Sequence, residues 1–376
     1  MPSSHKYPFY VRATVILFGL VLVSFALANL RGILIPFSFA LFLAILLNPL
    51  MERLLRWRIP RVAAISVSLV VAILVIGGVW YFLANQIMQF TDQLPLLERK
   101  GSELIRRTQD YLTGHWNVPL EKTNEYLADA KAGIKPLLGQ LLGTMAGTMG
   151  TVFLLPVYTF LMLYYKDLIL NFLYEIFREE QEEEVSTVLQ KVRGAIQSYM
   201  YGLLIEALIV ASLNTIALFV LGVQYAVLMG VLGALLNVLP FFGGILAAAL
   251  PIMVATITKE GYSTQIGIAI SYIIIQFIDN HFLIPYIVSA KVRINALLSV
   301  VAVLLGGAVW GLSGMFLSIP FIGVLKIVFD RIPEMQPWGR LLGDKVEPRR
   351  VSEQRRRIRP RRSEGRRSDE GLGGRR

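Results

Sequence analysis

The stretch Leu235–Pro251, LLNVLPFFGGILAAALP, decides the fold of this chain. It lies inside a long apolar run, yet Pro240, Gly243 and Gly244 interrupt it in the middle. A helix in lipid must satisfy its backbone N–H and C=O groups internally, so a break at membrane depth is tolerated only inside protein or beside a water-filled cavity. A second interrupted run, Leu304–Pro320 (LLGGAVWGLSGMFLSIP), follows later. We expect the two breaks to face each other across a solute pathway.

Composition indicates a membrane protein. Of the 376 residues, 55% are hydrophobic and only 17% are charged, against roughly 25% charged in soluble domains. Mean hydropathy is +0.58, and several apolar runs exceed the length of about 18 residues that is typical of a membrane-spanning helix. We therefore predict an all-α polytopic membrane protein. Cysteine is absent, which excludes disulfides and thiolate metal sites, and we expect no cofactor.

The apolar runs predict about six full spans and two interrupted runs. A very tight turn is expected at Arg31-Gly32, between the first two spans. Four arginines in the short loop before the third span mark the cytoplasmic side, which also places both chain termini in the cytoplasm. The full spans are expected at roughly 13–30, 33–51, 62–85, 141–165, 199–221 and 264–287, and the interrupted runs at 225–257 and 296–329.

These runs divide the chain into five parts. Residues 1–85 hold the first three spans, and 86–140 form an external helical cap, which serves either as a gate or as a packing and assembly element. Residues 141–198 hold the fourth span and a cytoplasmic amphipathic helical pair. Residues 199–332 form the transport unit. Residues 333–376 are a basic, disordered cytoplasmic tail, since 13 basic and 5 acidic residues from Lys345 to Arg376 give +8 of the net charge of +11.

The length of the interrupted runs favours re-entrant helical hairpins. The run 225–257 would measure about 50 Å as one straight helix, far more than the hydrocarbon core of about 30 Å, and each half alone is too short to cross. Two hairpins would enter from opposite faces, as in transporters built from inverted repeats. The alternative is eight ordinary spans, two of them long and kinked.

Polar residues in the segment 264–287 indicate a pathway. Tyr272, Gln276, Asp279 and Asn280 fall on or near one helical face. A buried aspartate costs about 2.5–3.5 kcal/mol at the centre of a spanning helix, so such residues usually mark ion or substrate pathways. The alternative is structural, with Asp279 and Asn280 bonding to free backbone groups at the hairpin tips. Asn237, one turn before the first break, is expected to point at the same cavity.

Glu206 is expected to pair with Lys191 or Arg193, or to stay solvated, because it lies nearer the cytoplasmic end of its helix; a role in transport is the less favoured alternative. The second break supplies backbone groups rather than side chains, and its glycines serve either solute binding or close helix packing. The complete candidate pathway is Asn237, Pro240, Gly243, Gly244, Tyr272, Gln276, Asp279, Asn280, Gly311, Gly314 and Pro320.

The chain resembles a known family over roughly residues 13–332. Segments 221–251, 275–292 and 304–320 are similar to the autoinducer-2 exporter family of bacterial inner-membrane proteins. The family's first break, I-P-x-x-G, is matched by Leu239–Gly243. Its acid-Asn pair is matched by Asp279-Asn280, although the family acid is more often Glu, and its final glycine pattern is matched by Gly306–Pro320. The resemblance implies transport in the bacterial inner membrane, by export of a small signalling solute or by sodium/proton antiport. It also implies that a homo-oligomer is plausible.

We therefore expect a secondary transporter that moves a small polar solute, such as autoinducer-2, by alternating access, with H⁺ or Na⁺ as coupling ion at Asp279. The alternatives are a Na⁺(Li⁺)/H⁺ antiporter and, in another class, a membrane scaffold. The sequence has neither a G-x-x-x-x-G-K-[ST] motif for ATP nor an intramembrane protease motif, so we do not expect an enzyme. The other expected partners are membrane lipids, with headgroups binding the tail, and no specific nucleic acid.

Overall fold

Helices make up the regular structure of the part of the chain that can be described. The computed structural model describes residues 8–116, 149–176, 182–237, 243–259, 261–288 and 294–344. Within these ranges the only β-structure is an isolated bridge between Ile294 and Gly343. The helices are α1 (Phe9–Asn29), α2 (Arg31–Arg56), α3 (Arg61–Trp116), α5 (Met149–Tyr164), α6 (Lys166–Ile176), α7 (Glu182–Val220), α8 (Ala226–Asn237), α9 (Gly243–Thr258), α10 (Ser263–Ile278), the π-helix η2 (Asp279–Val288), α11 (Ala296–Phe329), the 3₁₀-helix η3 (Pro333–Met335) and α12 (Gln336–Leu342).

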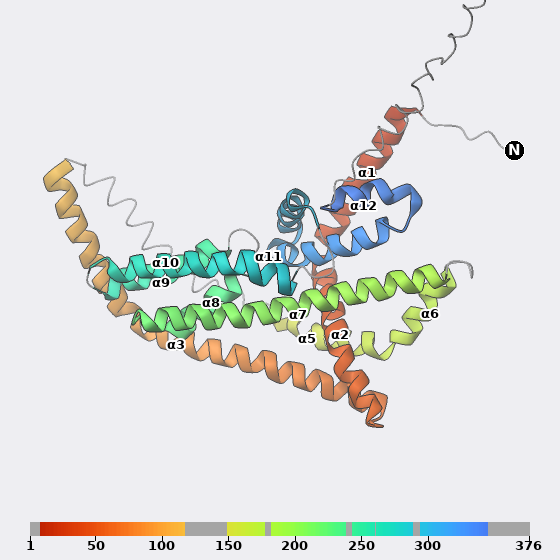
Figure 1. The fold of residues 1–376 in the computed structure, drawn as a ribbon, viewed down its shortest axis with the longest axis horizontal. Coiled ribbons are helices and arrows are strands. Elements are labelled where there is room, and N and C mark those ends of the chain that lie inside the picture. The colour runs from red at the N-terminus through yellow and green to blue at the C-terminus, as the bar shows by residue number, and fades with distance from the viewer. Residues whose placement is uncertain are drawn as a thin grey trace, which may run out of the picture.

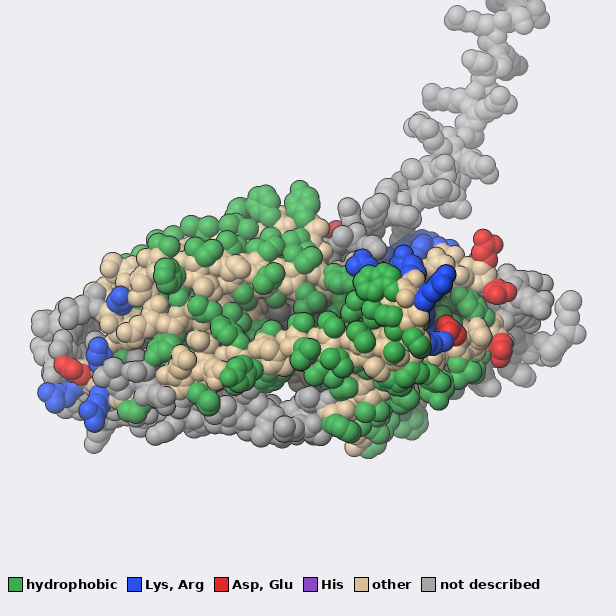
Figure 2. All heavy atoms as spheres, turned by 90° about the horizontal axis from the view of Figure 1, so that it is seen from below, with side chains coloured by type: hydrophobic (Ala, Val, Ile, Leu, Met, Phe, Trp, Pro, Cys, Tyr) green, Lys and Arg blue, Asp and Glu red, His purple; other side chains and the backbone are tan. Residues whose placement is uncertain are grey.

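The distribution of apolar surface is that of a multi-pass membrane protein. Five of the described helices are long and apolar enough to cross a bilayer, or six if α5 and α6, which meet at a bend of 62°, form one span. Large apolar side chains such as Phe18, Leu74 and Phe219 are exposed along these helices. Figure 2 shows one face on which apolar side chains cover the middle, while charged side chains gather toward the two ends. The prediction of a helical membrane protein is confirmed.

The tight turn predicted at Arg31-Gly32 is absent. Only Leu30 separates α1 from α2, and its backbone hydrogen bonds remain helical: its N–H donates to Ala26, and its carbonyl accepts from Ile33 and Leu34. Gly32 is not among the glycines with positive φ that a sharp reversal would use. Figure 1 shows α2 continuing from α1 rather than folding back along it.

Two other helices are longer than the spans expected from the sequence. Helix α3 runs unbroken from the third span into the predicted cap. The rest of the cap, from residue 117 onward, and the start of the predicted fourth span lie outside the described residues. Helix α7 likewise joins the second predicted amphipathic helix to the fifth span without a break at 198. The basic tail from residue 345 also lies outside the described part.

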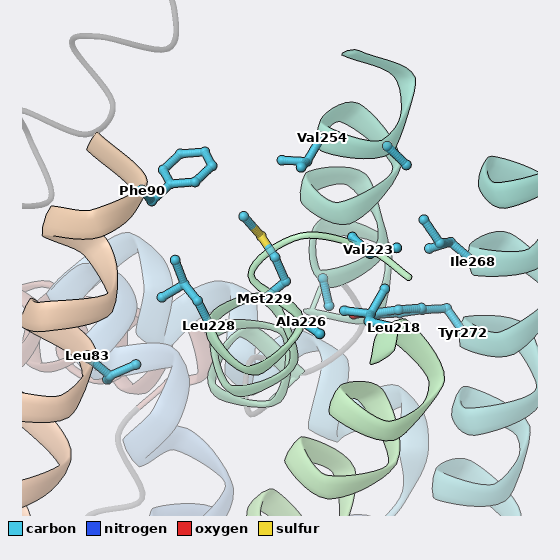
Figure 3. Close-up of a cluster of buried hydrophobic side chains, with 12 residues drawn as sticks. Leu83, Phe90, Leu218, Val223, Ala226, Leu228, Met229, Val254, Ile268 and Tyr272 are labelled. Atoms are coloured by element: carbon cyan, nitrogen blue, oxygen red, sulfur yellow. The ribbon is translucent and has the colours of Figure 1, made fainter. Parts of the chain in front are cut away.

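The apolar core is divided into clusters that follow the order of the helices. The largest cluster lies among α7, α8, α9 and α10, with Leu83 and Phe90 of α3 at its edge, and Figure 3 shows its side chains converging from these helices. A second cluster joins α2, α3 and α5. Helix α7 also packs against α2 and α11 through Ile196, so it connects the two groups of helices.

Helices α8 and α9 form an antiparallel pair. A methyl group added to Gly243, at the start of α9, would overlap the backbone of Leu236 and Asn237 at the end of α8. Further from the break, a methyl group added to Gly233 of α8 would lie 3.4 Å from Cβ of Ala247 in α9. At the opposite end, Gly222 and the side chain of Lys259 lie together. The first interrupted run therefore folds back on itself, and both of its ends lie on the same side of the break.

Helix α11 is folded in the same way around Gly311. Gly311 has φ 60° and ψ −141°, a conformation that interrupts the helix and that glycine adopts readily. A methyl group on Gly314 would overlap the carbonyl group of Gly306, although eight residues span about 12 Å in a straight helix. The N–H of Asn295, just before α11, donates to the carbonyl of Leu342 in α12. Both ends of α11 therefore meet beside α12.

Candidate functional site

One face of α7 carries the polar groups that face the interrupted run. Gly202, Glu206, Val210, Asn214 and Leu218 are buried and follow one another at intervals of four residues. That spacing places them on one stripe of the helix. The helix packs closely against α8, η2 and α10, so the stripe faces the first folded pair. Helices α8 and α10 and the π-helix η2 contribute polar groups to the interface with this stripe, and we call this interface the seam.

The centre of the site is a pair of carboxyl groups. Glu206 of α7 and Asp279 at the start of η2 lie within hydrogen-bonding distance of each other, and they are only 5% and 1% exposed. Asn237, the last residue of α8, donates from Nδ2 to Oδ2 of Asp279 at 2.7 Å. Oδ1 of Asp279 accepts no hydrogen bond from an N–H or O–H group of the described residues.

Gln276 connects this pair to the start of α9. Its Nε2 donates to Asp279 Oδ2 at 3.5 Å and to Asn280 Oδ1 at 3.4 Å. Its Oε1 lies so close to Gly244 that a methyl group on that glycine would overlap it. The structure brings together four residues of the predicted pathway, Asn237, Gln276, Asp279 and Asn280, although Asn280 itself is exposed. Gly243 and Gly244 are needed where α9 approaches α8 and Gln276.

The change from α-helix to π-helix occurs at Asp279 itself. π-Helical turns are frequent at functional sites, because an extra residue in the turn alters where side chains point. His281, which follows, is exposed, and its ring stacks on Phe277 with centroids 4.2 Å apart. Its exposed ring is therefore not part of the buried carboxyl pair.

Glu206 is the residue that the sequence prediction left out of the candidate pathway. Its side chain bonds to Asp279 rather than to Lys191, which is exposed, or to Arg193, which binds Glu52 at 3.2 Å. It is buried rather than solvated. The spacing of Glu206 and Asn214 at eight residues in an apolar helix is the signal that could have revealed it, since polar residues two turns apart share a face.

Helix α11, the second folded helix, lies outside the group formed by helices α8, α9, α10 and η2. Helix α11 packs against α7, α2, α1 and α12, and Trp310, beside its turn, donates from Nε1 to the carbonyl of Leu27 in α1 at 2.9 Å. Gly314 and Pro320 are buried within α11. The tip of the first pair, including Pro240, lies outside the described residues. That the two breaks face each other therefore stays a prediction.

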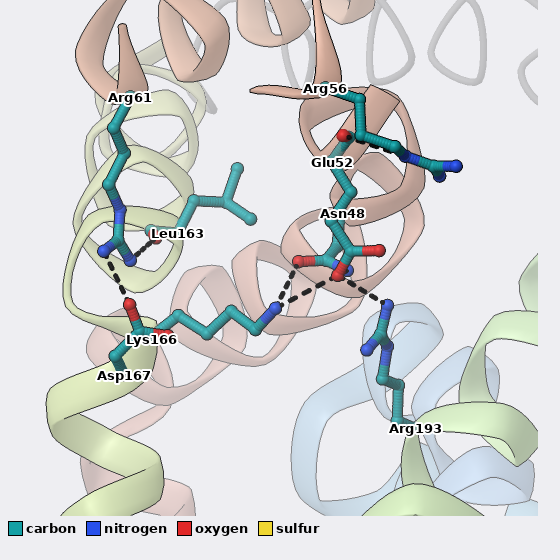
Figure 4. Close-up of polar contacts among 8 residues, drawn as sticks. All are labelled: Asn48, Glu52, Arg56, Arg61, Leu163, Lys166, Asp167 and Arg193. Carbon is teal, nitrogen blue, oxygen red and sulfur yellow. Dashed lines mark hydrogen bonds and ion pairs between the residues drawn. The ribbon is translucent and has the colours of Figure 1, made fainter. Parts of the chain in front are cut away.

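A separate charged cluster holds one end of the bundle together. Glu52 of α2 binds both Lys166 of α6 and Arg193 of α7 at 3.2 Å. Asn48 donates to Glu52 and accepts from Lys166. Figure 4 shows these groups converging from three helices, beside a second ion pair between Arg61 and Asp167. The groups of this cluster satisfy one another, so it is a structural joint rather than a binding site.

The chemistry of the carboxyl pair depends on how many protons its two groups carry. Two ionised carboxylates only accept hydrogen bonds, so they can bond to each other only when one carries a proton. Like charges in a buried site disfavour ionisation of both groups. A buried pair of this kind can take up and release a proton, or bind a cation with its oxygen atoms. These are properties that a coupling site in a transporter requires.

Comparison with known proteins shows the family to which the chain belongs. The protein-family model described as AI-2E family transporter matches residues 13–334 of the sequence. The AI-2 transport protein TqsA of Escherichia coli strain K12 is 27% identical over 335 residues, covering 88% of this chain and 95% of TqsA. A Haemophilus influenzae protein is 27% identical over 354 residues, covering 87% and 96%, and YrrI of Bacillus subtilis is 25% identical over 326 residues, covering 82% and 88%. These relatives are named as transport proteins and not as enzymes. The chain belongs to the AI-2E family of membrane transporters.

Proposed function

We propose that this protein is a secondary transporter that carries a small polar solute along the seam between α7 and the helices α8, α9, α10 and η2. The buried pair of Glu206 and Asp279 is its coupling site. The observation that carries the proposal is the contact between two carboxyl groups on different helices, with Asn237 at the end of α8 bonded to one of them. A change in the charge of the two carboxyl groups alters the hydrogen bond between Asp279 and Asn237, which holds the end of α8. Ion binding is thereby linked to movement of the folded pair of helices α8 and α9.

The membrane arrangement that we propose places both folded pairs as re-entrant hairpins that open to opposite sides. It is supported by the ends of each pair, which meet beside Lys259 in the first and beside α12 in the second. The segment between them, Ser263–Ile287, is long enough to cross a bilayer once. In this arrangement the protein lies in the bacterial inner membrane with its C-terminus in the cytoplasm, and alternating access moves the α7–α10 unit against α2, α3 and α5. The expected cytoplasmic N-terminus depended on a turn between α1 and α2, which the structure lacks, so it is not part of this proposal.

Single cysteines test the hairpins, because the native chain has none. Lys259, Ala296 and Arg331 are exposed in the structure. In oriented membranes, a thiol reagent that cannot cross the bilayer should label K259C from the outside, and should label A296C and R331C only after permeabilisation. Labelling of A296C and R331C from opposite sides would show that α11 crosses the membrane, and the hairpin arrangement would be wrong.

The solute is expected to be small and polar. TqsA is named for AI-2, which makes autoinducer-2 the first solute to test. The same carboxyl pair would also suit a Na⁺(Li⁺)/H⁺ antiporter, because carboxylate oxygens bind hard cations. Flux in response to Na⁺ or Li⁺ alone, without an organic solute, would favour the antiporter.

Purified protein in proteoliposomes tests the coupling site. Uptake of autoinducer-2 and of a panel of neutral, cationic and anionic solutes is measured under imposed H⁺ and Na⁺ gradients. We expect E206Q and D279N each to abolish the dependence of transport on the driving gradient. The matched controls are E175Q and D344N, which change exposed carboxyl groups on α6 and after α12, and they should behave as the wild type. Unchanged gradient dependence in D279N would remove the pair from the mechanism.

A further inference from the structure

Two buried polar side chains lie further along the seam, and neither has a hydrogen-bond partner for its oxygen atom. Asn214 of α7 is 2% exposed and Tyr272 of α10 is 6% exposed. Oδ1 of Asn214 and the hydroxyl group of Tyr272 find no partner among the described residues. A buried polar group without a hydrogen-bond partner lowers the stability of the fold. Two such groups close together therefore need an explanation.

Both side chains converge on one glycine. A methyl group added to Gly233 of α8 would lie 3.1 Å from Nδ2 of Asn214 and 3.4 Å from the hydroxyl oxygen of Tyr272. Figure 3 shows the side chain of Tyr272 crossing from α10 toward the end of α7 that carries Leu218. The absence of a side chain at position 233 leaves the backbone of α8 beside both groups. Three helices therefore meet at a point that is polar although its surroundings are apolar.

This point is separate from the carboxyl pair. Asn214 follows Glu206 by eight residues on α7, and Asp279 follows Tyr272 by seven. At about 1.5 Å per residue these separations correspond to roughly 10–12 Å along the seam. The two separations are nearly equal. Glu206 of α7 therefore lies opposite Asp279, and Asn214 of α7 lies opposite Tyr272 of α10, further along the seam.

We infer that Asn214 and Tyr272 form a second recognition point, which binds a hydrogen-bond donor group of the transported solute. The groups without a partner are an amide oxygen, which only accepts, and a phenol oxygen, which accepts and donates. The solute class is therefore neutral or cationic, with at least one hydroxyl or amine group. Residues 199–258 and 263–288 contain no lysine or arginine, and their acidic residues are Glu206 and Asp279, so an anion would find no counter-charge in these segments.

The inference rests on the proposed transport function, but it concerns recognition and not coupling. Its test uses Y272F and N214L in the full-length protein, with Y286F and N171L as matched controls at exposed tyrosine and asparagine positions. The first readout is the Tm of the purified, solute-free protein, which requires no knowledge of the solute. The second is the KM for the solute that the wild type carries in the proteoliposome panel, together with the pH dependence of transport.

We expect Y272F to have a Tm equal to or above that of the wild type, because it removes a buried group that has no partner. Its KM should rise about tenfold, the effect of losing one buried hydrogen bond to the solute, while the pH dependence stays that of the wild type. N214L should raise the KM in the same way, and both controls should leave Tm and KM unchanged.

Three results would overturn the inference. A Tm of Y272F clearly below that of Y286F would show that the hydroxyl group has a structural role. A raised Tm with an unchanged KM in both variants would show that only water binds there. Transport of anionic solutes as efficiently as neutral ones would refute the solute class. Failure of the coupling proposal would show itself differently, as unchanged gradient dependence in E206Q and D279N.

Discussion

Replacing Gly314 by alanine should destabilise the protein, because the two halves of α11 touch at this residue. The added methyl group would overlap the carbonyl oxygen of Gly306, would lie 2.6 Å from the carbonyl carbon of the same residue, and would lie 2.9 Å from Cβ of Trp310. Ordinary contacts between carbon atoms are about 3.5–4.0 Å, so the halves must separate by about 1 Å.

Overpacking of this kind costs about 1–3 kcal/mol. At an unfolding entropy of about 2.1 cal/mol/K per residue, a chain of 376 residues loses roughly 1 °C in Tm per kcal/mol. We therefore expect the Tm of G314A, measured by intrinsic tryptophan fluorescence in detergent, to fall by roughly 1–4 °C. Gly77, inside α3, provides the matched control, because a methyl group there has no atom within 4 Å. Alanine at position 77 should be neutral or slightly stabilising, since it favours the helix.

A Tm for G314A equal to that of G77A would refute the reasoning. In a straight α11, residues 306 and 314 would lie about 12 Å apart, and alanine at 314 would then meet no backbone. The comparison therefore tests the folded geometry of α11 itself, independently of transport.

Two further substitutions test the packing of the bundle. Changing Glu52 to Lys brings three cations together with Lys166 and Arg193, so the Tm should fall, and the loss should shrink in high salt because the groups are partly exposed; a loss that does not depend on salt would contradict an electrostatic cause. Changing Trp310 to Phe removes the hydrogen bond to Leu27 and should cost about 0.5–1.5 kcal/mol in denaturant unfolding, whereas an unchanged midpoint would show that this bond does not hold α1.

The sequence predicts much of this fold because its strongest signals are physical constraints imposed by lipid. Apolar length indicates spanning helices, and proline or glycine inside such a run indicates a break that protein must surround. The prediction that each interrupted run folds back follows from this reasoning, and the contacts of Gly243 and Gly314 agree with it. The grouping of Asn237 with Asp279 was likewise predictable, because Asn237 lies one turn before the first break and Asp279 lies on the polar helical face that was expected to line the same cavity.

Other features depend on contacts between distant helices. Glu206 was predicted to lie near a charged end because only its position along α7 was considered, whereas the packing of α7 against η2 buries it beside Asp279. The continuous passage from α1 to α2 was missed because Gly32 permits a turn without requiring one. The surroundings of Trp310 depend on how α11 packs against α1, which no local pattern encodes.

The most direct test of the central claim, that Glu206 and Asp279 act together as one coupling site, is a double-mutant cycle on the pH dependence of transport. Initial rates in proteoliposomes are measured across pH for the wild type, E206Q, D279N and the double variant. We predict that the wild type depends on pH, that each single variant loses this dependence, and that the double variant is no slower than the slower single variant, because the pair holds one shared proton. Effects that multiply, or pH dependence that persists in either single variant, would contradict the claim.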